Sequence, residues 1–443
     1  MRIKSIVIKK GTFRVHNIET SKHNNYYANG VLVHNCFSYF FKSNNPSMKT
    51  HELKQVNVKR LLKKMNGESP QDVMYRHFYK RKFLLHWGGL ADPFCSFEKT
   101  NGTGLELIKG LGKLNYPTLF SFKGPTILEK NYLKTFEKYQ KQSNFAFQAS
   151  IITRDDDMAK RVEIGVPSPT KRLKALKELS DMGYWTILRL RPFIVGISDV
   201  GLDELLNDAL AAGINGVSCE FFAMDARANI GMKTRYDWLG QLTGIKNMHE
   251  YYTVLSPKER GGYRRLNRLV KEPYIKKIYK FCIENNLVCG ISDPDFKELN
   301  TSGSCCAMPD NFKKNPEMQN WTTSQLTYHL KEIRKTYHKT GKLERLYFDK
   351  VYNSGKETYL EEWRFANDHP CTVGMSHARV RNTNLKQITQ RSWNNLHSPG
   401  NPRNYFHGKV VPVDQDSKGN LVFEYAPHDY EAQWKKEGID LTK

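Results

Sequence analysis

The chain has 443 residues, of which 39% are hydrophobic and 12% aromatic, a composition ordinary for a globular protein and too apolar for a disordered one. No apolar run reaches the length of a membrane helix and no secretory signal opens the chain, so we expect a soluble, cytoplasmic protein. The formal net charge is +24, which favours polyanions such as nucleic acid, with a scattered solubilising surface as the alternative.

The start of the chain predicts a small unit of β structure. Residues 2–10 and 13–20 are typical of strands, and residues 26–33 are typical of a hairpin with a tight turn at Asn29-Gly30. A unit this short has no core of its own, so we expect it to need a partner.

Three reactive side chains follow this hairpin, in the order His34, Asn35, Cys36. Asn35 can cyclise on its own carbonyl, an imidazole beside it can move the proton, and a cysteine can hold an acyl group meanwhile. Side chains of this kind in this order can cut and rejoin a peptide backbone. The alternative is an ordinary hairpin followed by a chance His-Asn-Cys sequence.

Helices and strands then alternate along the chain, which predicts a parallel sheet in an open or closed barrel. In such barrels the chemistry lies at the carboxyl ends of the strands. We predict helices at 51–66, 104–114, 127–142, 169–182 and 202–212, and strands at 82–87, 118–122, 146–152, 185–190 and 216–222.

The segments 15–19 and 26–36 resemble the C-terminal splicing blocks of inteins. The resemblance implies that residues 1–35 are a split-intein C-terminal fragment with a small all-β (Hint) fold. A separate chain would supply the N-terminal intein half and its thioester. Cys36 would attack that thioester, and cyclisation of Asn35 would release the intein, so that the chain is a precursor joined in trans.

Residues 36–310 resemble radical S-adenosylmethionine enzymes, in the branch of spore photoproduct lyase and DNA repair photolyase-like proteins, by the ordered set of strand ends Gly88-Gly89, Ser121–Gly124, Gln148–Ser150 and Leu188–Arg191. The resemblance implies an incomplete (β/α) barrel over residues 36–324, a [4Fe–4S] cluster and S-adenosylmethionine. The family holds its cluster on Cys-x3-Cys-x2-Cys, which is absent here. We therefore expect the first strand and two cluster cysteines on the partner chain, with Cys36 as the remaining iron ligand.

The same resemblance assigns binding roles to the strand ends. Gly88 and Gly89 would face the amino acid part of S-adenosylmethionine, since glycines let the backbone approach a ligand closely. Ser150 could bond a ribose hydroxyl, and Arg189 or Arg191 could meet a carboxylate. Asp92 belongs to the same set, either at the ligand or holding its loop. A glycine turn, a satisfied core serine and a surface salt bridge are the structural alternatives.

Three later features remain open from the sequence. Cys289, Cys305 and Cys306 could form a second metal site or be buried as small apolar residues. The basic segment 258–280 could face phosphates or be a solvated helix face. Residues 325–443 form a basic α+β region, with a helix at 325–339 and a hairpin at 408–425, in which cations interleave with aromatics as in single-strand binders. Folded surface loops would explain the same residues without nucleic acid.

The sequence therefore predicts a trans-spliced, lyase-like radical S-adenosylmethionine enzyme that acts on DNA or RNA, in repair or modification. A trans-spliced basic nucleic-acid-binding protein without cluster chemistry is the alternative.

Overall fold

The structure is a computed structural model. It describes residues 25–28, 31–34, 57–68, 79, 82, 84–89, 92–96, 98–163, 165–226, 230–256, 263–319, 325–353, 385–398 and 400–443.

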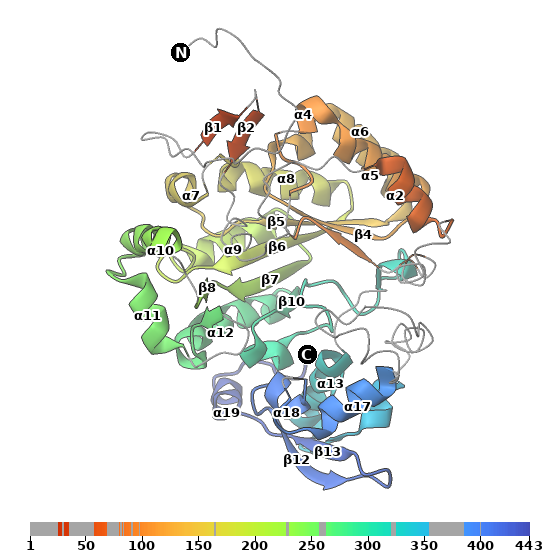
Figure 1. The fold of residues 1–443 in the computed structure, drawn as a ribbon, viewed down its shortest axis with the longest axis vertical. Coiled ribbons are helices and arrows are strands. Elements are labelled where there is room, and N and C mark those ends of the chain that lie inside the picture. Colours follow the sequence, from red (N-terminus) through yellow and green to blue (C-terminus); the bar gives the residue numbers. More distant parts are fainter. Residues whose placement is uncertain are drawn as a thin grey trace, which may run out of the picture.

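A six-stranded parallel sheet forms the centre of the molecule (Figure 1). The five strands predicted between residues 82 and 222 are all confirmed, and β4 has the predicted bounds. Among the described residues β3 and β10 are the two edges, so the sheet is an open, partial α/β barrel. In spatial order the strands are β10 (Val288–Ile291), β7 (Gly216–Phe221), β6 (Trp185–Phe193), β5 (Phe145–Ser150), β4 (Thr118–Phe122) and β3 (Leu85–Trp87).

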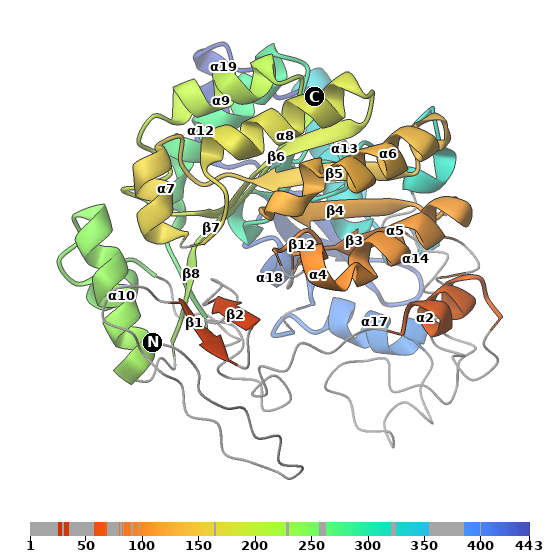
Figure 2. The same cartoon turned by 90° about the horizontal axis from the view of Figure 1, so that it is seen from above.

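Helices cover one side of this sheet, which we call the outer face (Figure 2). Phe120, Phe147 and Leu188 point to this side and are fully buried in the main hydrophobic core. Local signals set the helix ends: Pro169 opens α8, and the Asn267 side chain accepts from the Val270 N–H at the start of α12. The covering elements are α2 (Val58–Met65), α4 (Glu98–Asn101), α5 (Thr103–Lys113), η2 (Pro125–Leu128), α6 (Lys130–Tyr139), η3 (Gln140–Gln142), α7 (Asp156–Val162), α8 (Pro169–Asp181), α9 (Leu202–Ala211) and α12 (Arg268–Glu284).

The opposite side of the sheet, the inner face, is covered at the amino half of its strands by the segment 301–319. Successive residues of a strand point to opposite sides, so Leu119, Ala146 and Ile187 face away from the helices. These three side chains pack against Ala307 and Met308 of the segment. The segment follows β10 and η4 (Pro294–Leu299) and ends in η5 (Pro316–Gln319). It closes the amino end of the sheet and leaves the carboxyl half of the inner face for polar side chains.

A smaller unit lies beside the carboxyl end of β7. It contains the antiparallel pair β8 (Ala223–Asp225) and β9 (Tyr263–Arg265), with α10 (Ile230–Thr243) and α11 (Met248–Leu255) between them in the chain. The sequence did not predict this unit.

The predicted amino-terminal hairpin is present in part. Strands β1 (Asn25–Ala28) and β2 (Val31–His34) pair antiparallel, with Asn25 opposite His34. The expected turn at Asn29-Gly30 and the expected strands at 2–10 and 13–20 lie outside the described residues.

The carboxyl-terminal region has its own small hydrophobic core, formed by residues such as Leu330, Trp393 and Phe423. The predicted helix and hairpin are both confirmed as α13 and as β12 with β13. The elements are α13 (Gln325–Thr340), β11 (Arg345–Leu346), α14 (Phe348–Tyr352), α17 (Leu385–Asn394), α18 (Pro402–Tyr405), β12 (Val410–Gln415), β13 (Leu421–Tyr425) and α19 (Asp429–Lys436).

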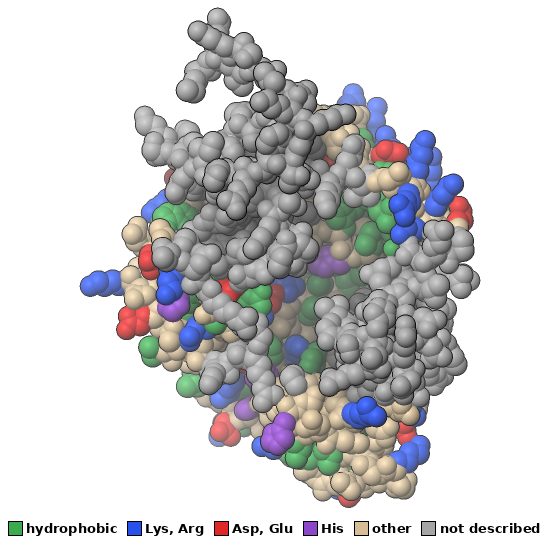
Figure 3. Space-filling model, in the orientation of Figure 1, with side chains coloured by type: hydrophobic (Ala, Val, Ile, Leu, Met, Phe, Trp, Pro, Cys, Tyr) green, Lys and Arg blue, Asp and Glu red, His purple; other side chains and the backbone are tan. Residues whose placement is uncertain are grey.

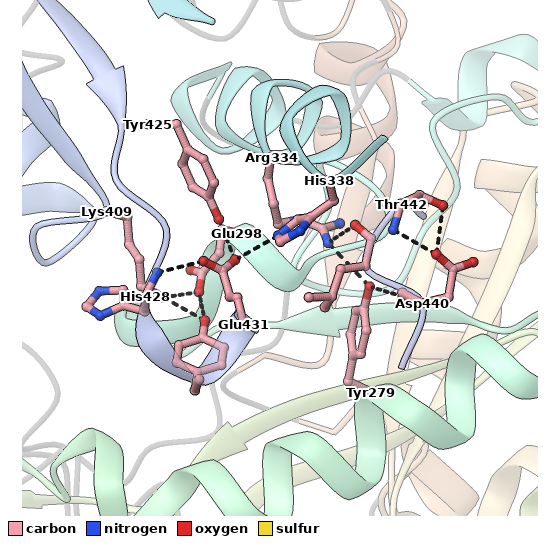
Figure 4. Close-up of polar contacts among 12 residues, drawn as sticks. Tyr279, Glu298, Arg334, His338, Lys409, Tyr425, His428, Glu431, Asp440 and Thr442 are labelled. Atoms are coloured by element: carbon pink, nitrogen blue, oxygen red, sulfur yellow. Dashed lines mark hydrogen bonds and ion pairs between the residues drawn. The ribbon is translucent and has the colours of Figure 1, made fainter. Parts of the chain in front are cut away.

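Buried polar contacts join this region to the barrel (Figure 4). Lys409 and Tyr430 both contact the buried carboxylate of Glu298 in η4. Arg334 of α13 donates to the Leu441 carbonyl at 2.7 Å and to the Tyr279 hydroxyl of α12 at 3.3 Å. Since a buried charge without its partner is costly, these contacts hold the last residues of the chain against the barrel.

Within the part of the chain that the structure describes, no helix is long and apolar enough to cross a membrane.

Candidate functional site

The proposed splicing residues are only partly described. His34 is the last residue of β2 and pairs in register with Asn25. Asn35 and Cys36 lie outside the described residues, so the structure brings no geometry to the three-residue junction.

Polar side chains from neighbouring strands form a row across the carboxyl half of the inner face. His86 of β3 and Ser121 of β4 lie 2.6 Å apart, Nε2 to Oγ. The Gln148 amide nitrogen of β5 contacts the same Ser121 hydroxyl and lies 2.9 Å from His86 Nε2. Gln148 Oε1 is buried and has no hydrogen-bond partner among the described residues. The side chains of His86, Ser121 and Gln148 therefore contact one another, and Gln148 Oε1 remains as a buried acceptor without a described donor.

His86 is neutral in this setting. Burial first, and then the positive charges of Arg189 and Arg191, lower the pKa of His86 from 6.5 to about 4. At neutral pH the ring therefore offers one donor and one acceptor rather than a charge.

Arg189 of β6 continues the row, and its guanidinium has one buried donor, Nε, without a described partner. It makes no side-chain hydrogen bond or ion pair with a described residue, and its buried Nε atom has no partner. Burial and the neighbouring charge of Arg191 lower the pKa of Arg189 to about 10. A cation held this way favours an anionic or carbonyl ligand, because a buried unpaired charge is costly.

Arg191, two residues further along β6, is already paired. Its Nε lies 2.9 Å from Glu220 Oε2 of β7, and its Nη2 contacts the same oxygen. Arg265 of β9 reaches Glu220 Oε1 at 3.3 Å. The carboxylate that Arg191 meets is thus one of this chain, and of the two arginines Arg189 is the one open to a ligand.

The paired glycines differ in their surroundings. Gly88 has φ +112°, and a Cβ there would lie 1.9 Å from the Ser121 carbonyl oxygen. Gly89 has no such restriction, because its nearest neighbour, His86 Cε1, is 3.9 Å away. Gly88 is therefore required for the close packing of β3 against β4, and Gly89 leaves space beside the row.

Asp92 holds its loop. Its carboxylate accepts from the Phe94 N–H at 2.8 Å and from the Lys123 N–H at 2.6 Å. Burial raises the pKa of Asp92, and these backbone hydrogen bonds oppose that rise. The sequence leaves open whether Asp92 meets the ligand or holds its loop. The hydrogen bonds in the structure are those of a residue that holds its loop.

Ser150 ends β5 beside a buried ion-pair network. The Ser150 carbonyl accepts from Arg172, whose Nη2 lies 2.6 Å from Glu163, and Lys123 contacts the same carboxylate. Although burial favours the neutral acid, Arg172 and Lys123 lower the pKa of Glu163 to about 2. The network fixes the carboxyl ends of β4 and β5 relative to each other.

The three cysteines of the possible second metal site are not brought together. Cys289 points to the outer face, where its thiol and the thiol of Cys282 in α12 are hydrogen-bonded and both cysteines are free. Cys305 and Cys306 lie on the segment under the inner face, and Arg191 Nη1 is 3.9 Å from Cys306 Sγ. No group of three or more His, Cys, Asp or Glu side chains suited to a metal occurs in the described ranges.

The basic segment 258–280 is largely paired with acids where it is described. These ion pairs leave less free positive charge than the sequence suggests. The pairs are Arg268–Glu272, Lys271–Asp293, Lys276–Glu437, Lys277–Asp203 and Lys280–Glu284.

Sequence reasoning did not assign roles to His86, Gln148 or Glu220. The signal available for them was alternation: each is a polar residue at an inward position of an otherwise apolar strand. The face shown in Figure 3 has a hollow at its centre, with histidine, basic and hydrophobic side chains in view on its described floor.

No family model, curated protein or solved structure matches this chain.

Proposed function

We propose that this chain is one half of a precursor that is joined in trans to a partner chain and then works as a radical S-adenosylmethionine enzyme. The observation that carries the enzyme proposal is the row of polar side chains at the carboxyl half of an open parallel sheet. The row includes two buried unsatisfied groups, Gln148 Oε1 and Arg189 Nε. Active sites of parallel barrels lie at this end of the strands.

The position of β3 supports the idea of a missing strand. β3 is an edge strand among the described residues, and it carries His86 and leads into Gly88. An edge strand presents unpaired backbone N–H and C=O groups that another chain can pair with. A first barrel strand supplied by the partner would extend the sheet here and place its own carboxyl end beside the polar row.

The described residues suit a small polar cofactor. An unpaired guanidinium at Arg189 matches a carboxylate, and the Gln148 Oε1 acceptor matches an amine or hydroxyl donor. S-adenosylmethionine with a reduced iron–sulfur cluster would supply radical chemistry at this site. The chain's own contribution is to bind through Arg189 and Gln148, and to keep His86 neutral in the row.

The described residues do not hold a cluster by themselves, because no suitable set of three thiolates or other ligands occurs among them. In the proposal Cys36 is the one thiolate from this chain, and the partner supplies two. The same sulfur would be first the splicing nucleophile and then an iron ligand.

Nucleic acid is the proposed substrate class, supported by the net charge of +24. Because the described part of the basic segment is mostly paired, this support rests on the chain's overall charge rather than on a single patch.

Splicing is tested by mixing the purified chain with a candidate partner that ends in an intein N-terminal half, and by measuring the mass of the product. We expect a joined product that lacks residues 1–35 and that is lost in Asn35→Ala but kept in the matched control Asn45→Ala. The same product from Asn35→Ala would refute splicing at this junction.

Iron and sulfide analysis of the joined product distinguishes the proposed radical S-adenosylmethionine enzyme from a nucleic-acid-binding protein without a cluster. We expect iron and sulfide only after joining. Because Cys36 is also the proposed splicing nucleophile, the joined sequence with Cys36→Ser is made by direct gene fusion, and we expect it to contain neither iron nor sulfide. A joined product that binds nucleic acid without iron would favour the alternative, a binding protein without cluster chemistry.

A further inference from the structure

Cys305 and Cys306 are held in a defined position under the sheet. The Cys305 carbonyl accepts from the Ser218 hydroxyl of β7 at 3.1 Å, and the Cys306 N–H donates to the Ser304 hydroxyl at 3.2 Å. Trp185 Nε1 of β6 donates to the carbonyl of Ala307, the residue that follows Cys306, at 3.2 Å. The backbone that carries the two thiols is thus fixed against β6 and β7.

The approach of this segment to β10 is unusually close. A Cβ at Gly290 would lie 2.6 Å from the Ala307 nitrogen and 2.9 Å from the Cys305 carbonyl oxygen. Ala307 itself has φ +56°, a conformation that a residue with a side chain rarely adopts. The glycine and the strained alanine together indicate that the position of the cysteine pair is built into the fold.

The charges around the pair favour one thiolate. A hydrogen bond from the Cys306 thiol and the charge of Arg191 lower the pKa of Cys305, although burial and Glu220 oppose this. The same hydrogen bond and burial raise the pKa of Cys306, against Arg191 and Arg189. These directions favour ionisation of Cys305 over ionisation of Cys306, and Arg191, with Nη1 3.9 Å from Cys306 Sγ, places a positive charge beside the pair.

The two residues also differ from most described cysteines in exposure. Cys219, Cys282 and Cys289 are buried, whereas Cys305 and Cys306 are partly exposed. The pair therefore lies nearer to solvent than the three buried cysteines, which a reagent can reach only when the fold opens.

We propose that Cys305 and Cys306 form a thiol–disulfide exchange site, in which Cys305 attacks a small-molecule disulfide and Cys306 resolves the product. This activity depends neither on splicing nor on a cofactor.

The reaction balances with a low-molecular-weight disulfide as the oxidant. The Cys305 thiolate bonds to one sulfur of that disulfide, the disulfide bond breaks, and one thiolate leaves. Cys306 then loses its proton to solvent and attacks the Cys305 sulfur, which releases the second thiolate. Both released thiolates take up protons. The small disulfide is reduced to two thiols, and the cysteine pair is oxidised to an internal disulfide.

The test uses the full chain, reduced and then freed of reductant, with oxidised glutathione at pH 6. After an acid quench and trypsin digestion, mass spectrometry follows the peptide 298–313, which contains only these two cysteines. At this pH an ordinary thiol is almost fully protonated. We expect the internal disulfide to form about tenfold faster in the folded chain than in the chain unfolded in denaturant.

Variants assign the two roles. In Cys306→Ser a glutathione adduct should accumulate on the peptide, and in Cys305→Ser the peptide should react about tenfold more slowly than wild type. Cys95→Ser, which removes the other partly exposed described cysteine, should leave the rate unchanged. A thermal unfolding curve for each variant tests whether that variant is folded before the rates are compared. Equal rates in the folded and unfolded chains, or equal adduct formation in both serine variants, would overturn the proposal.

Discussion

His86 Nε2 lies 2.6 Å from Ser121 Oγ, across the neighbouring strands β3 and β4. This contact begins the polar row on the inner face, and the low pKa of His86 favours the neutral form of the ring there. Its proton is excluded by burial and by two arginines on the same side of the sheet.

The depressed pKa of His86 predicts a loss of stability in mild acid. Because the folded state binds this proton less readily than the unfolded state, the His86 contribution is fully present above pH 6.5. It is lost as the pH falls towards about 4. The free energy of unfolding of wild type should therefore fall more steeply over this range than that of His86→Gln.

Denaturant titrations at several pH values measure this difference, with His397→Gln, a histidine outside the polar row, as the control. A His86 pKa above 6.5 by NMR would contradict the prediction.

Glu163→Gln should destabilise the chain by about 3 kcal/mol or more, since it leaves the buried guanidinium of Arg172 without its counter-charge. Glu178→Gln is the matched control. It removes an exposed helix pair with Lys174 and should cost less than about 0.5 kcal/mol. Urea unfolding measures both, and equal effects would show that the buried network adds no stability.

The two neighbouring glycines should respond differently to alanine. Gly88→Ala should cost at least about 2 kcal/mol, because the new Cβ meets the Ser121 carbonyl and φ is +112°. Gly89→Ala should change the free energy of unfolding by less than about 1 kcal/mol, since the space there is open. Thermal unfolding ranks the two variants, and a tolerated Gly88→Ala would argue against the described packing of β3 on β4.

Substitution of the two arginines of β6 should have different effects on the free energy of unfolding. Arg189→Met removes a guanidinium that makes no side-chain hydrogen bond or ion pair with a described residue, so we expect stability to be unchanged or increased. Arg191→Met removes the closer of the two partners of Glu220, and we expect a loss of about 2 kcal/mol.

In the joined protein, Arg189→Met should weaken S-adenosylmethionine binding at least about tenfold by calorimetry. Retained affinity would remove Arg189 from the proposed cofactor site without affecting the stability result.

Local patterns predicted the strands and most helices of the barrel well. β4 is five consecutive buried residues between a proline and a lysine, and such a run is recognisable without tertiary information. The predicted helix at 127–142 was less exact. Its core is α6, and the flanking turns are the 3₁₀ segments η2 and η3. The unit of β8 to β9 was missed because its strands have only three residues each.

The site was predictable only in part. The strand ends carrying Gly88, Ser150, Arg189 and Arg191 could be located from the alternation of elements, since parallel strands end at a common edge. The partners of the individual side chains could not be predicted. The pairing of Arg191 with Glu220, for example, depends on the register of β6 against β7.

The sequence by itself determined the class of fold, since alternating helices and strands can bury their apolar faces only around a parallel sheet. It also contains the order His34, Asn35, Cys36, on which the splicing proposal rests. Only the tertiary structure decided which polar groups share the inner face, and that Cys305 and Cys306 return beneath it to meet Arg191. Such contacts join residues far apart in the chain, and they depend on strand register and on the path of a connecting segment, which local patterns do not encode.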